Sequence, residues 1–297
     1  PGQGLGFVVQ RGEMVGVRQW CPSRGREGRV WARERDIDGS ECAVVTGASS
    51  GIGAASARGL VEAGFRRLVL VARRKSKLEE LARELRSCHP GTLVHTAELD
   101  VRDLARVQEL PQQLPPEYQR VTLLLNNAGL AAGFGKLYEY DLEDMEAMLD
   151  TNVKGLAACC RAFLPDMVER AEGHVINLSS IAGKQAYPNG AFYCASKHAV
   201  EAITSSLRSE LVDTPVRVTA ISPGWVFEGT EFSSVRYNGD KEKVSKVYEG
   251  FEPLTAEDVS ELVVFAATRP LRVTIADVYI LPTNQAHAFP GGIFRRT

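Results

Sequence analysis

Short apolar runs alternate with longer amphipathic stretches along most of the chain. Seven runs rich in Val, Ile and Leu have the length and composition of buried strands, namely Cys42–Thr46, Arg67–Val71, Thr92–Ala97, Val121–Leu125, His174–Leu178, Val216–Ile221 and Val278–Leu281. Stretches with a helical repeat of apolar residues are Ile52–Ala63, Lys77–Ser87, Leu142–Arg170, Phe192–Val212 and Ala256–Thr268. Strands that alternate with helices form βαβ crossovers. The pattern therefore predicts an α/β fold, with a doubly wound, mostly parallel seven-stranded sheet covered by helices on both faces.

The pattern changes near residue 38. Residues 1–38 contain seven glycines and seven arginines but no lysine, and neither helical nor strand periodicity is strong there. Acidic residues among the arginines argue against a targeting peptide, and no apolar segment of a secretory signal is present. We predict a poorly structured extension over residues 1–38. No internal repeat or linker divides residues 41–290, so we predict one domain over residues 39–297.

The composition is that of a globular protein without a strong charge of either sign. With 35 Lys and Arg against 37 Asp and Glu, the net charge of −2 gives no reason to expect nucleic acid or an anionic membrane as a partner. No window approaches the roughly 18 apolar residues of a membrane span. The cysteines show no CxxC spacing and the histidines no HxxxH spacing. We therefore expect a cytoplasmic location, no disulfide framework and no metal site.

A glycine-rich turn follows the first predicted strand directly. Residues 46–53 contain a GxxxGxG spacing, and the helical pattern starts inside it. Glycines at such a turn let the backbone approach a pyrophosphate, and the helix N-terminus supplies N–H donors and a positive dipole. A purely structural turn is the alternative. The residues that would contact a dinucleotide here are Gly47, Ser49, Ser50, Gly51, Ile52 and Gly53.

Tyr193 and Lys197 form a YxxxK pair early in a predicted helix. Four residues make slightly more than one helical turn, so both side chains project from the same face. Hydride transfer at a carbinol carbon needs a proton to move at its oxygen, and a nearby ammonium favours the phenolate form of tyrosine. We therefore expect Tyr193 to exchange the proton and Lys197 to lower the pKa of Tyr193. Ser179 or Ser180, at the end of the preceding strand, would orient the substrate oxygen.

These motifs, together with Asn126 to Gly129 after the fourth strand, resemble the short-chain dehydrogenase/reductase family over about residues 40–285. The resemblance implies a Rossmann-type fold and an enzyme that acts on CH–OH groups with a nicotinamide cofactor. It favours Ser180, thirteen residues before Tyr193, as the catalytic serine. It also implies that Asn152 holds a water that links Lys197 to solvent.

The resemblance further distributes the cofactor contacts along the chain. It implies contacts of Asp100 and Val101 with the adenine, of Asn127, Ala128 and Gly129 with the adenosine ribose, of Tyr193 and Lys197 with the nicotinamide ribose, and of Pro223, Gly224, Val226 and Thr230 beside the nicotinamide. Thr230 stands two residues later than in the usual PGxVxT pattern of relatives. The threonine contact is therefore the least regular of the set.

The end of the second strand predicts the cofactor preference. Ala72 occupies the position where NAD-preferring relatives carry Asp, and Arg73 and Arg74 follow it. A guanidinium pairs bidentately with a 2′-phosphate. We therefore predict NADP(H), with Arg73 as the first candidate, Arg74 as the second, and the serines of the glycine turn as helpers. Two solvated arginines at the start of a helix are the alternative.

The region after Gly224 resembles that of the NADP-dependent 3-hydroxy acid dehydrogenases, also called serine dehydrogenases. The resemblance implies a substrate loop at about 225–254 and reversible hydride transfer at the hydroxyl or carbonyl carbon of short 3-hydroxy or 3-oxo acids. Arg236 is a candidate partner for the substrate carboxylate. Trp225 and Phe227 keep a broad-specificity NADPH carbonyl reductase open as an alternative, and a catalytically silent NADP-binding scaffold is another.

The same resemblance concerns assembly. Relatives form tetramers through two long helices, which correspond here to Leu142–Arg170 and Phe192–Val212. We therefore expect a homotetramer or a homodimer.

Overall fold

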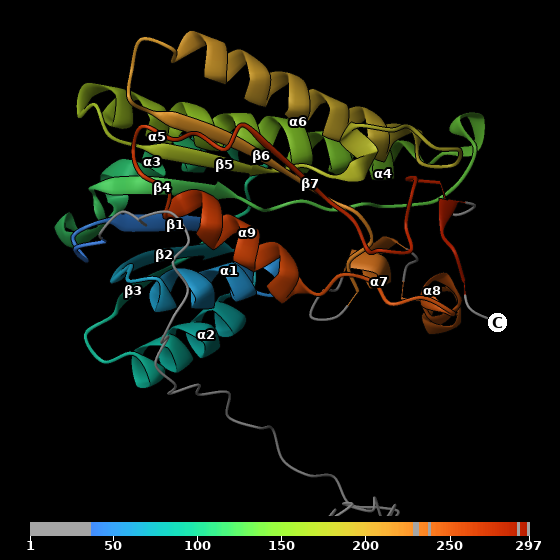
Figure 1. Cartoon of the computed structure of the whole chain (residues 1–297), viewed down its shortest axis with the longest axis horizontal. Coiled ribbons are helices and arrows are strands. Elements are labelled where there is room, and N and C mark those ends of the chain that lie inside the picture. Colours follow the sequence, from blue (N-terminus) through green and yellow to red (C-terminus); the bar gives the residue numbers. More distant parts are fainter. Residues whose placement is uncertain (1–36, 228–231, 237–238, 290–291, 296–297) are drawn as a thin grey trace, which may run out of the picture. The chain divides into compact units, whose positions relative to one another are not determined.

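A parallel sheet organises the protein. The computed structural model describes residues 37–227, 232–236, 239–289 and 292–295. The strands are β1 (Cys42–Thr46), β2 (Arg67–Ala72), β3 (Leu93–Glu98), β4 (Val121–Asn126), β5 (His174–Leu178), β6 (Arg217–Pro223) and β7 (Asp277–Ile280). They form a seven-stranded sheet in the order β3-β2-β1-β4-β5-β6-β7 (Figure 1). Each of its strand pairs is parallel, so the predicted sheet is confirmed.

Strand β1 is the point where the direction of the sheet reverses. The chain adds β2 and β3 on one side of β1 and then β4 to β7 on the other. The connections that leave β1 and β4 diverge at such a point, which opens a crevice beyond the carboxyl ends of the strands. The glycine turn follows β1, and Asn127 to Gly129 follow β4. Both motifs therefore meet at this crevice.

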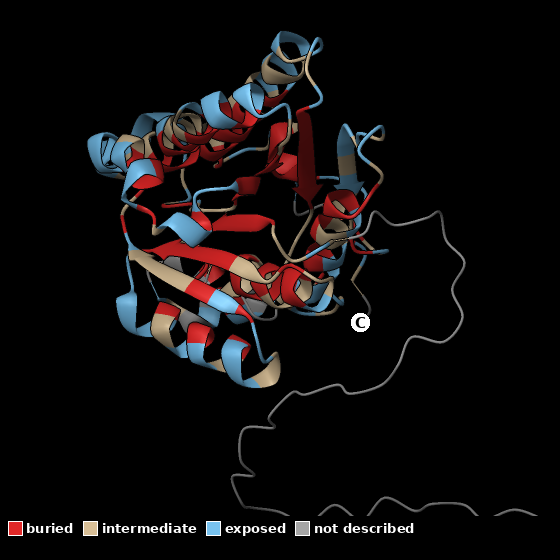
Figure 2. Cartoon of the chain, turned by 90° about the vertical axis from the view of Figure 1, so that its left-hand side faces the viewer, coloured by how far each residue is buried: buried red, intermediate tan, exposed pale blue. Residues whose placement is uncertain are grey.

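Helices cover both faces of the sheet, as predicted. Helices α1 (Gly51–Glu62), α2 (Lys75–Cys88) and α9 (Ala256–Ala267) lie on one face (Figure 1). Helices α3 (Leu104–Gln113), α5 (Leu156–Glu169) and α6 (Ala191–Glu210) lie on the other. The inner strands β1, β2, β4, β5 and β6 are buried on both sides, which explains their continuous apolar runs, whereas the edge strands β3 and β7 are partly exposed (Figure 2).

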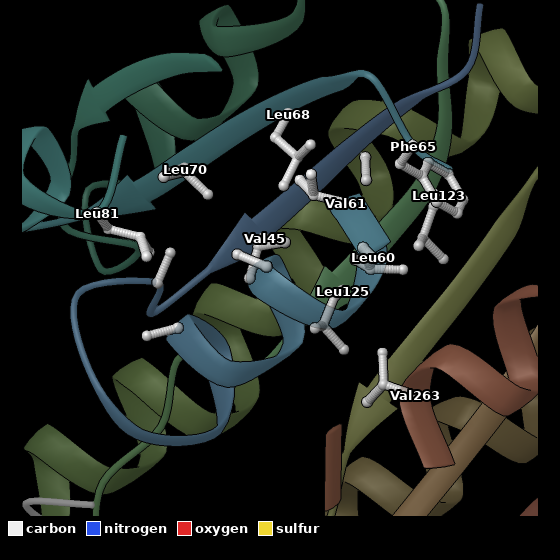
Figure 3. Close-up of a cluster of buried hydrophobic side chains, with 14 of the residues drawn as sticks. Val45, Leu60, Val61, Phe65, Leu68, Leu70, Leu81, Leu123, Leu125 and Val263 are labelled. Carbon is white, nitrogen blue, oxygen red and sulfur yellow. The ribbon is translucent and has the colours of Figure 1, made fainter. Parts of the chain in front are cut away.

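Each face of the sheet has its own apolar core. Leu60 of α1, Leu125 of β4 and Val263 of α9 belong to the core shown in Figure 3. Successive residues of a strand point to opposite faces, so Val45 packs into this core whereas Val44 packs into the core under α5 and α6. The two cores hold the strands in place, and with them the carboxyl ends of the strands that carry the site.

The predicted helix Leu142–Arg170 is interrupted in the structure. It consists of α4 (Leu142–Leu149), a π-helical segment η3 (Asp150–Gly155) and α5. The segment packs closely at Gly155, where a Cβ atom would lie 2.8 Å from Cγ2 of Val101. A hydrophobic repeat is an average over many residues, so it does not reveal a single widened turn.

The structure also contains helices that the hydrophobic pattern does not predict. Helix α3 includes Pro111, and the Asp103 carboxylate caps its N-terminus by accepting a hydrogen bond from the Arg106 N–H at 3.1 Å. Helices α7 (Phe232–Arg236) and α8 (Lys241–Tyr248) are too short to show a clear repeat. The remaining short elements are the 3-10 helices η1 (Pro116–Tyr118), η2 (Leu137–Glu139) and η4 (Ile181–Gly183).

The described part of the chain begins at Ile37, which packs against the core of α1 and α9. The predicted extension therefore lies almost wholly outside the described residues and stays a prediction. Within the described ranges, no helix combines the length and hydropathy that crossing a membrane requires. In the same ranges, no three or more His, Cys, Asp or Glu side chains gather as a metal site would need.

Candidate active site

A cavity of about 420 Å³ lies in the crevice beyond the carboxyl ends of β1 and β4. Its volume is in the range of small-molecule sites. All but three of the predicted site residues line it. Gly53 and Asn152 do not line it, and Thr230 lies outside the described residues. Motifs that are far apart in the sequence therefore converge on one cavity.

The glycine turn is packed too closely for side chains. Gly47 has a φ of +66°, and a Cβ atom there would lie 2.8 Å from Nδ2 of Asn127. A Cβ atom at Gly53 would lie 2.5 Å from the same nitrogen. Helix α1 begins at Gly51, and the Ser50 side chain makes no capping hydrogen bond to it. The first N–H groups of α1 thus border the cavity without a side-chain cap.

Thr46 joins the two strand ends that flank the crevice. Its hydroxyl oxygen accepts hydrogen bonds from the N–H groups of Asn127 and Ala128, both at 3.0 Å. In return, Nδ2 of Asn127 donates to the Thr46 carbonyl at 2.9 Å. Sequence analysis did not assign Thr46 a role. Its position as the last residue of β1, opposite the asparagine after β4, is the signal that would have identified it.

Arg74 is bound to the glycine turn. Its Nη2 atom donates to the hydroxyls of Ser49 at 2.9 Å and Ser50 at 2.8 Å. Arg73 instead lies toward Asp100, with 3.8 Å between Nη1 and Oδ2, and its side chain is 63% exposed. The structure therefore brings Arg74, more than Arg73, into contact with the predicted phosphate-binding turn.

Asp100 lies at the same end of the cavity. Arg102 donates to its carboxylate at 2.7 Å. Burial raises the pKa of Asp100, but the hydrogen bonds and charge of Arg102 outweigh this and lower the pKa below its usual value. This carboxylate is thus an ionised hydrogen-bond acceptor, as contact with an adenine amino group would require.

Ser180 and Tyr193 meet at the other end of the cavity. Ser180 precedes η4 and accepts a hydrogen bond from the Ala182 N–H at 3.1 Å. Its hydroxyl also acts on the phenol of Tyr193, in the first turn of α6, and lowers the pKa of that phenol against the effect of burial. Ser179 faces Glu201 instead and is one of the groups that lower the pKa of Glu201 against the effect of burial. Of the two serines, Ser180 is therefore the one beside Tyr193.

Lys197 lies one turn after Tyr193 on α6 and is buried. Its Nζ atom donates to the carbonyl oxygen of Leu178 at 2.8 Å. Burial lowers the pKa of Lys197 to about 8, and the negative charge of Glu201 opposes this. Glu201 itself accepts hydrogen bonds from Lys184 and Ser222, both at 2.7 Å. Glu201 was not among the predicted residues, although it stands four residues after Lys197 on the same helix.

Asn152 lies in the π-helical segment, behind the cavity wall. Its side-chain oxygen accepts from the Leu130 N–H at 2.9 Å, and its amide nitrogen donates to the Leu130 carbonyl at 2.8 Å. The same nitrogen donates to the Ser196 hydroxyl at 3.0 Å. Asn152 thus ties the segment after β4 to α6. The water that the family resemblance assigns to this residue stays an expectation.

The electrostatics around Tyr193 include a cation that the sequence analysis did not place there. Burial raises the pKa of Tyr193 to about 12, while the Ser180 hydrogen bond and the positive charge of Arg236 lower it. Arg236, from α7, is therefore a second cation beside this phenol, in addition to the Lys197 of the sequence-based expectation. The lowering effect expected of Lys197 stays a prediction.

Aromatic side chains form the walls around Tyr193. The ring of Phe232 meets that of Tyr193 edge to face, with 5.4 Å between centroids. The rings of Trp225 and Tyr248 meet edge to face, with 5.7 Å between centroids, and both residues line the same cavity. Phe134 also lines it, and sequence analysis missed this residue because it follows a Gly- and Ala-rich stretch with no repeat.

Comparison with known proteins agrees with this geometry. A family model described as short chain dehydrogenase matches residues 41–237. The NADP-dependent 3-hydroxy acid dehydrogenase of Schizosaccharomyces pombe is 42% identical over 245 residues, which cover 82% of this chain and 93% of that protein. Its counterpart in Salmonella typhi is 45% identical and covers 82% and 96%. A solved closed form of serine dehydrogenase complexed with NADP+ superposes with a TM-score of 0.79 at 40% identity, covering 86% of this chain and 99% of that one.

Proposed function

The chain belongs to the short chain dehydrogenase family, and from that premise we propose that it is an NADP(H)-dependent oxidoreductase. The proposed reaction is reversible hydride transfer between the nicotinamide and the hydroxyl or carbonyl carbon of short 3-hydroxy or 3-oxo acids. The names of the two enzyme relatives and the bound cofactor of the serine dehydrogenase support this assignment.

One observation carries the proposal. The Ser180–Tyr193 pair and Lys197 line the same cavity as the glycine turn and the arginines after β2. A dinucleotide needs a phosphate site and a reaction site within one continuous cavity, and this cavity has both. A binding module without chemistry would need only the first.

The residues at the phosphate end fit NADP(H). The close packing at Gly47 keeps the turn free of side chains, and the start of α1 offers N–H groups for a pyrophosphate. Arg74 with Ser49 and Ser50 combines a guanidinium and two hydroxyls, a donor set suited to a 2′-phosphate. Bound NADP(H) supplies the hydride acceptor or donor.

The residues at the other end handle the proton. We assign to Tyr193 the exchange of a proton with the substrate oxygen, as an acid in reduction and as a base in oxidation. Ser180, which lines the cavity beside that phenol and lowers its pKa, would orient the same oxygen. Lys197, held by the Leu178 carbonyl, would bind the nicotinamide ribose. Asn152 would keep the β4 segment and α6 in register around them.

A second candidate function follows from the aromatic walls. Trp225, Phe232 and Tyr248 offer apolar surface to a neutral ketone or aldehyde. A broad-specificity NADPH carbonyl reductase would use the same proton-transfer residues on such substrates.

A substrate panel separates these functions. NADPH consumption is measured with 3-oxo acids, aromatic ketones and aldehydes, and NADP+ reduction with short 3-hydroxy acids and L-serine. We expect the acids to have the highest kcat/KM. A preference for neutral aromatic ketones would support the second candidate. Tight NADPH binding without turnover of any compound would refute both and leave an NADP-binding scaffold.

We further propose that residues 39–297 act as one catalytic domain in the cytoplasm, and that copies associate as a homotetramer or homodimer. Leu142 on α4 and Val168 on α5 support association through these helices, because their apolar side chains are 67% and 38% exposed. Light scattering on the purified protein measures the number of copies.

A further inference from the structure

Arg236 extends from α7 to the substrate end of the cavity. Its guanidinium carbon lies 4.9 Å from the ring centroid of Phe134, 5.4 Å from that of Tyr187 and 5.8 Å from that of Tyr193. The Arg236 side chain lines the same cavity as Ser180. A permanent positive charge therefore stands beside the phenol that we assign to proton transfer.

The surroundings of this guanidinium suit a substrate anion. The aromatic faces hold the cation but leave its full charge in place, and this charge lowers the pKa of the Tyr187 phenol against the effect of burial. An arginine fork matches the two oxygens of a carboxylate, and the pairing strengthens where neighbouring groups exclude water. On the same helix, the Ser233 hydroxyl pairs with that of Tyr248 at 2.5 Å, so two hydroxyls line this end as well.

We propose that Arg236 binds the carboxylate of the substrate and selects acids over neutral molecules of the same shape. The inference rests on the proposed function, because the other end of the same substrate must meet Ser180 and Tyr193. The separation of 5.8 Å between the guanidinium carbon and the Tyr193 ring places both groups within reach of one short molecule. A short acid with its hydroxyl carbon two bonds from the carboxylate carbon meets this requirement.

The same charge couples acid binding to the ionisation of Tyr193. The polar and titratable groups around the phenol are Ser180 before η4, Tyr187 in the next loop, Cys194 and Lys197 on α6, Arg236 on α7 and Tyr248 on α8. Burial raises the pKa of Tyr193, Cys194 and Tyr248 raise it further, and the charge of Arg236 lowers it. A bound carboxylate offsets that charge. The pKa of Tyr193 should therefore be higher with an acid bound than with a neutral substrate.

A matched pair of substrates tests the recognition of the carboxylate. 3-Hydroxypropanoate and 3-hydroxypropanamide have the same heavy-atom skeleton, but only the first carries a charge at neutral pH. In Arg236→Met, we expect kcat/KM for the acid to fall on the order of 100-fold, because a charge-assisted bidentate contact is lost. The value for the amide should change little. Arg83→Met, at an exposed arginine of α2, is the matched control and should leave both values unchanged.

The outcomes separate this inference from the proposed function. Equal losses for the acid and the amide, or no loss for either, would overturn the role of Arg236. Absence of turnover by the wild-type protein with the whole panel would instead overturn the proposed function. NADPH affinity, measured by fluorescence titration, reports whether each variant is folded. If Arg236→Met loses it, Arg236→Gln, which is polar but uncharged, repeats the test, and an undiminished preference for the acid would then contradict the inference.

A pH profile distinguishes the charge of Arg236 from its shape. In alcohol oxidation Tyr193 accepts the proton, so kcat rises with pH through the apparent pKa of this tyrosine. With the amide as substrate, Arg236→Met should shift this rise to higher pH, because the charge that favours the phenolate is gone. Arg236→Lys keeps a charge and should stay close to the wild-type profile. An unshifted rise in Arg236→Met would contradict the coupling.

Discussion

The phenol oxygen of Tyr193 is the atom on which the proposed chemistry depends. Tyr193→Phe removes this oxygen but keeps the ring, which is buried and in contact with Phe232. We expect kcat to fall by a factor of about 100 or more, because general acid–base catalysis is lost. The affinity for NADPH should stay nearly unchanged. Stopped-flow turnover and fluorescence titration measure the two quantities.

The control for this variant is Tyr138→Phe. Tyr138 is 79% exposed and does not line the cavity, so its phenol has no part in the proposed chemistry. This substitution should leave kcat unchanged. Wild-type turnover in Tyr193→Phe would show that another group moves the proton.

Arg74 is the residue-scale test of cofactor preference. The hydrogen bonds to Ser49 and Ser50 hold its guanidinium at the glycine turn. We expect Arg74→Ala to raise KM for NADPH roughly 10-fold or more, as loss of a charged contact to a phosphate would do. KM for NADH should change much less. Arg73→Ala should show a smaller difference, because the Arg73 guanidinium lies toward Asp100 and not at the serines of the glycine turn.

Steady-state kinetics with both cofactors decide this prediction. A larger effect at Arg73 would restore the order that the sequence favours. An equal loss of NADPH and NADH in both variants would show that neither arginine binds the 2′-phosphate.

The residue scale also shows what sequence spacing can predict. The YxxxK spacing placed Tyr193 and Lys197 on one face of a helix because that geometry is local. The spacing does not reveal that a second cation, Arg236, also acts on the phenol. Arg236 reaches Tyr193 from α7, more than 40 residues later in the chain. That relation depends on the tertiary structure.

At the scale of elements, the π-helical segment links the core to the site. Gly155 ends this segment against Val101, and Asn152 inside it binds Leu130 and Ser196. A Cβ atom at position 155 would lie 2.8 Å from Val101, so Gly155→Ala must displace the segment. We expect unfolding free energy to fall by about 1–3 kcal/mol, as overpacking does. We also expect kcat to fall, because Asn152 moves with the segment.

Gly135→Ala is the matched control for Gly155→Ala. A Cβ atom at Gly135 would meet no atom within 4 Å. Urea unfolding and kcat should therefore stay close to wild type in this variant. If stability and kcat of Gly155→Ala also stay close to wild type, the segment accommodates the extra methyl group without cost and does not position Asn152.

The elements that the sequence predicted and those it missed differ in a physical way. The buried strands are continuous apolar runs, so their positions agree with the prediction to within a residue or two. Helix α3 was missed because it carries Pro111 and depends on the Asp103 cap. Helices α7 and α8 are short, and α7 gains its significance from Arg236. The positions of these short helices therefore depend on packing over the cavity, which a hydrophobic repeat does not reveal.

At the scale of the whole molecule, the parallel sheet brings distant motifs together. The strand order places the ends of β1 and β4 side by side, although about 80 residues separate them. The family resemblance could supply this order, and with it most of the cavity lining. It could not supply Phe134, in the loop after β4, or Ala288, in the segment after β7. Both residues line the cavity. Loop residues of this kind follow no repeat.

The cavity lining and the core contacts also predict where the catalytic domain begins. The described residues that line the cavity lie between Gly47 and Ala288, whereas Ile37 packs on the α1 and α9 core. Arg67 donates to the Gly39 carbonyl, and Arg120 donates to the Ser40 hydroxyl at 2.6 Å. Deletion of residues 1–36 should therefore leave kcat/KM and the thermal midpoint unchanged, since it removes none of these contacts.

Deletion of residues 1–40 is the matched comparison. It removes the Ile37 contacts and the two acceptors of the arginines, the Gly39 carbonyl and the Ser40 hydroxyl. The unfolding free energy should therefore fall by about 1–3 kcal/mol. The cavity stays intact, so kcat of the folded fraction should change little. Calorimetry and turnover on the two truncated proteins separate stability from activity. Loss of kcat in the shorter deletion would mean that residues 1–36 contribute to the active site, and the single-domain boundary near residue 38 would then be wrong.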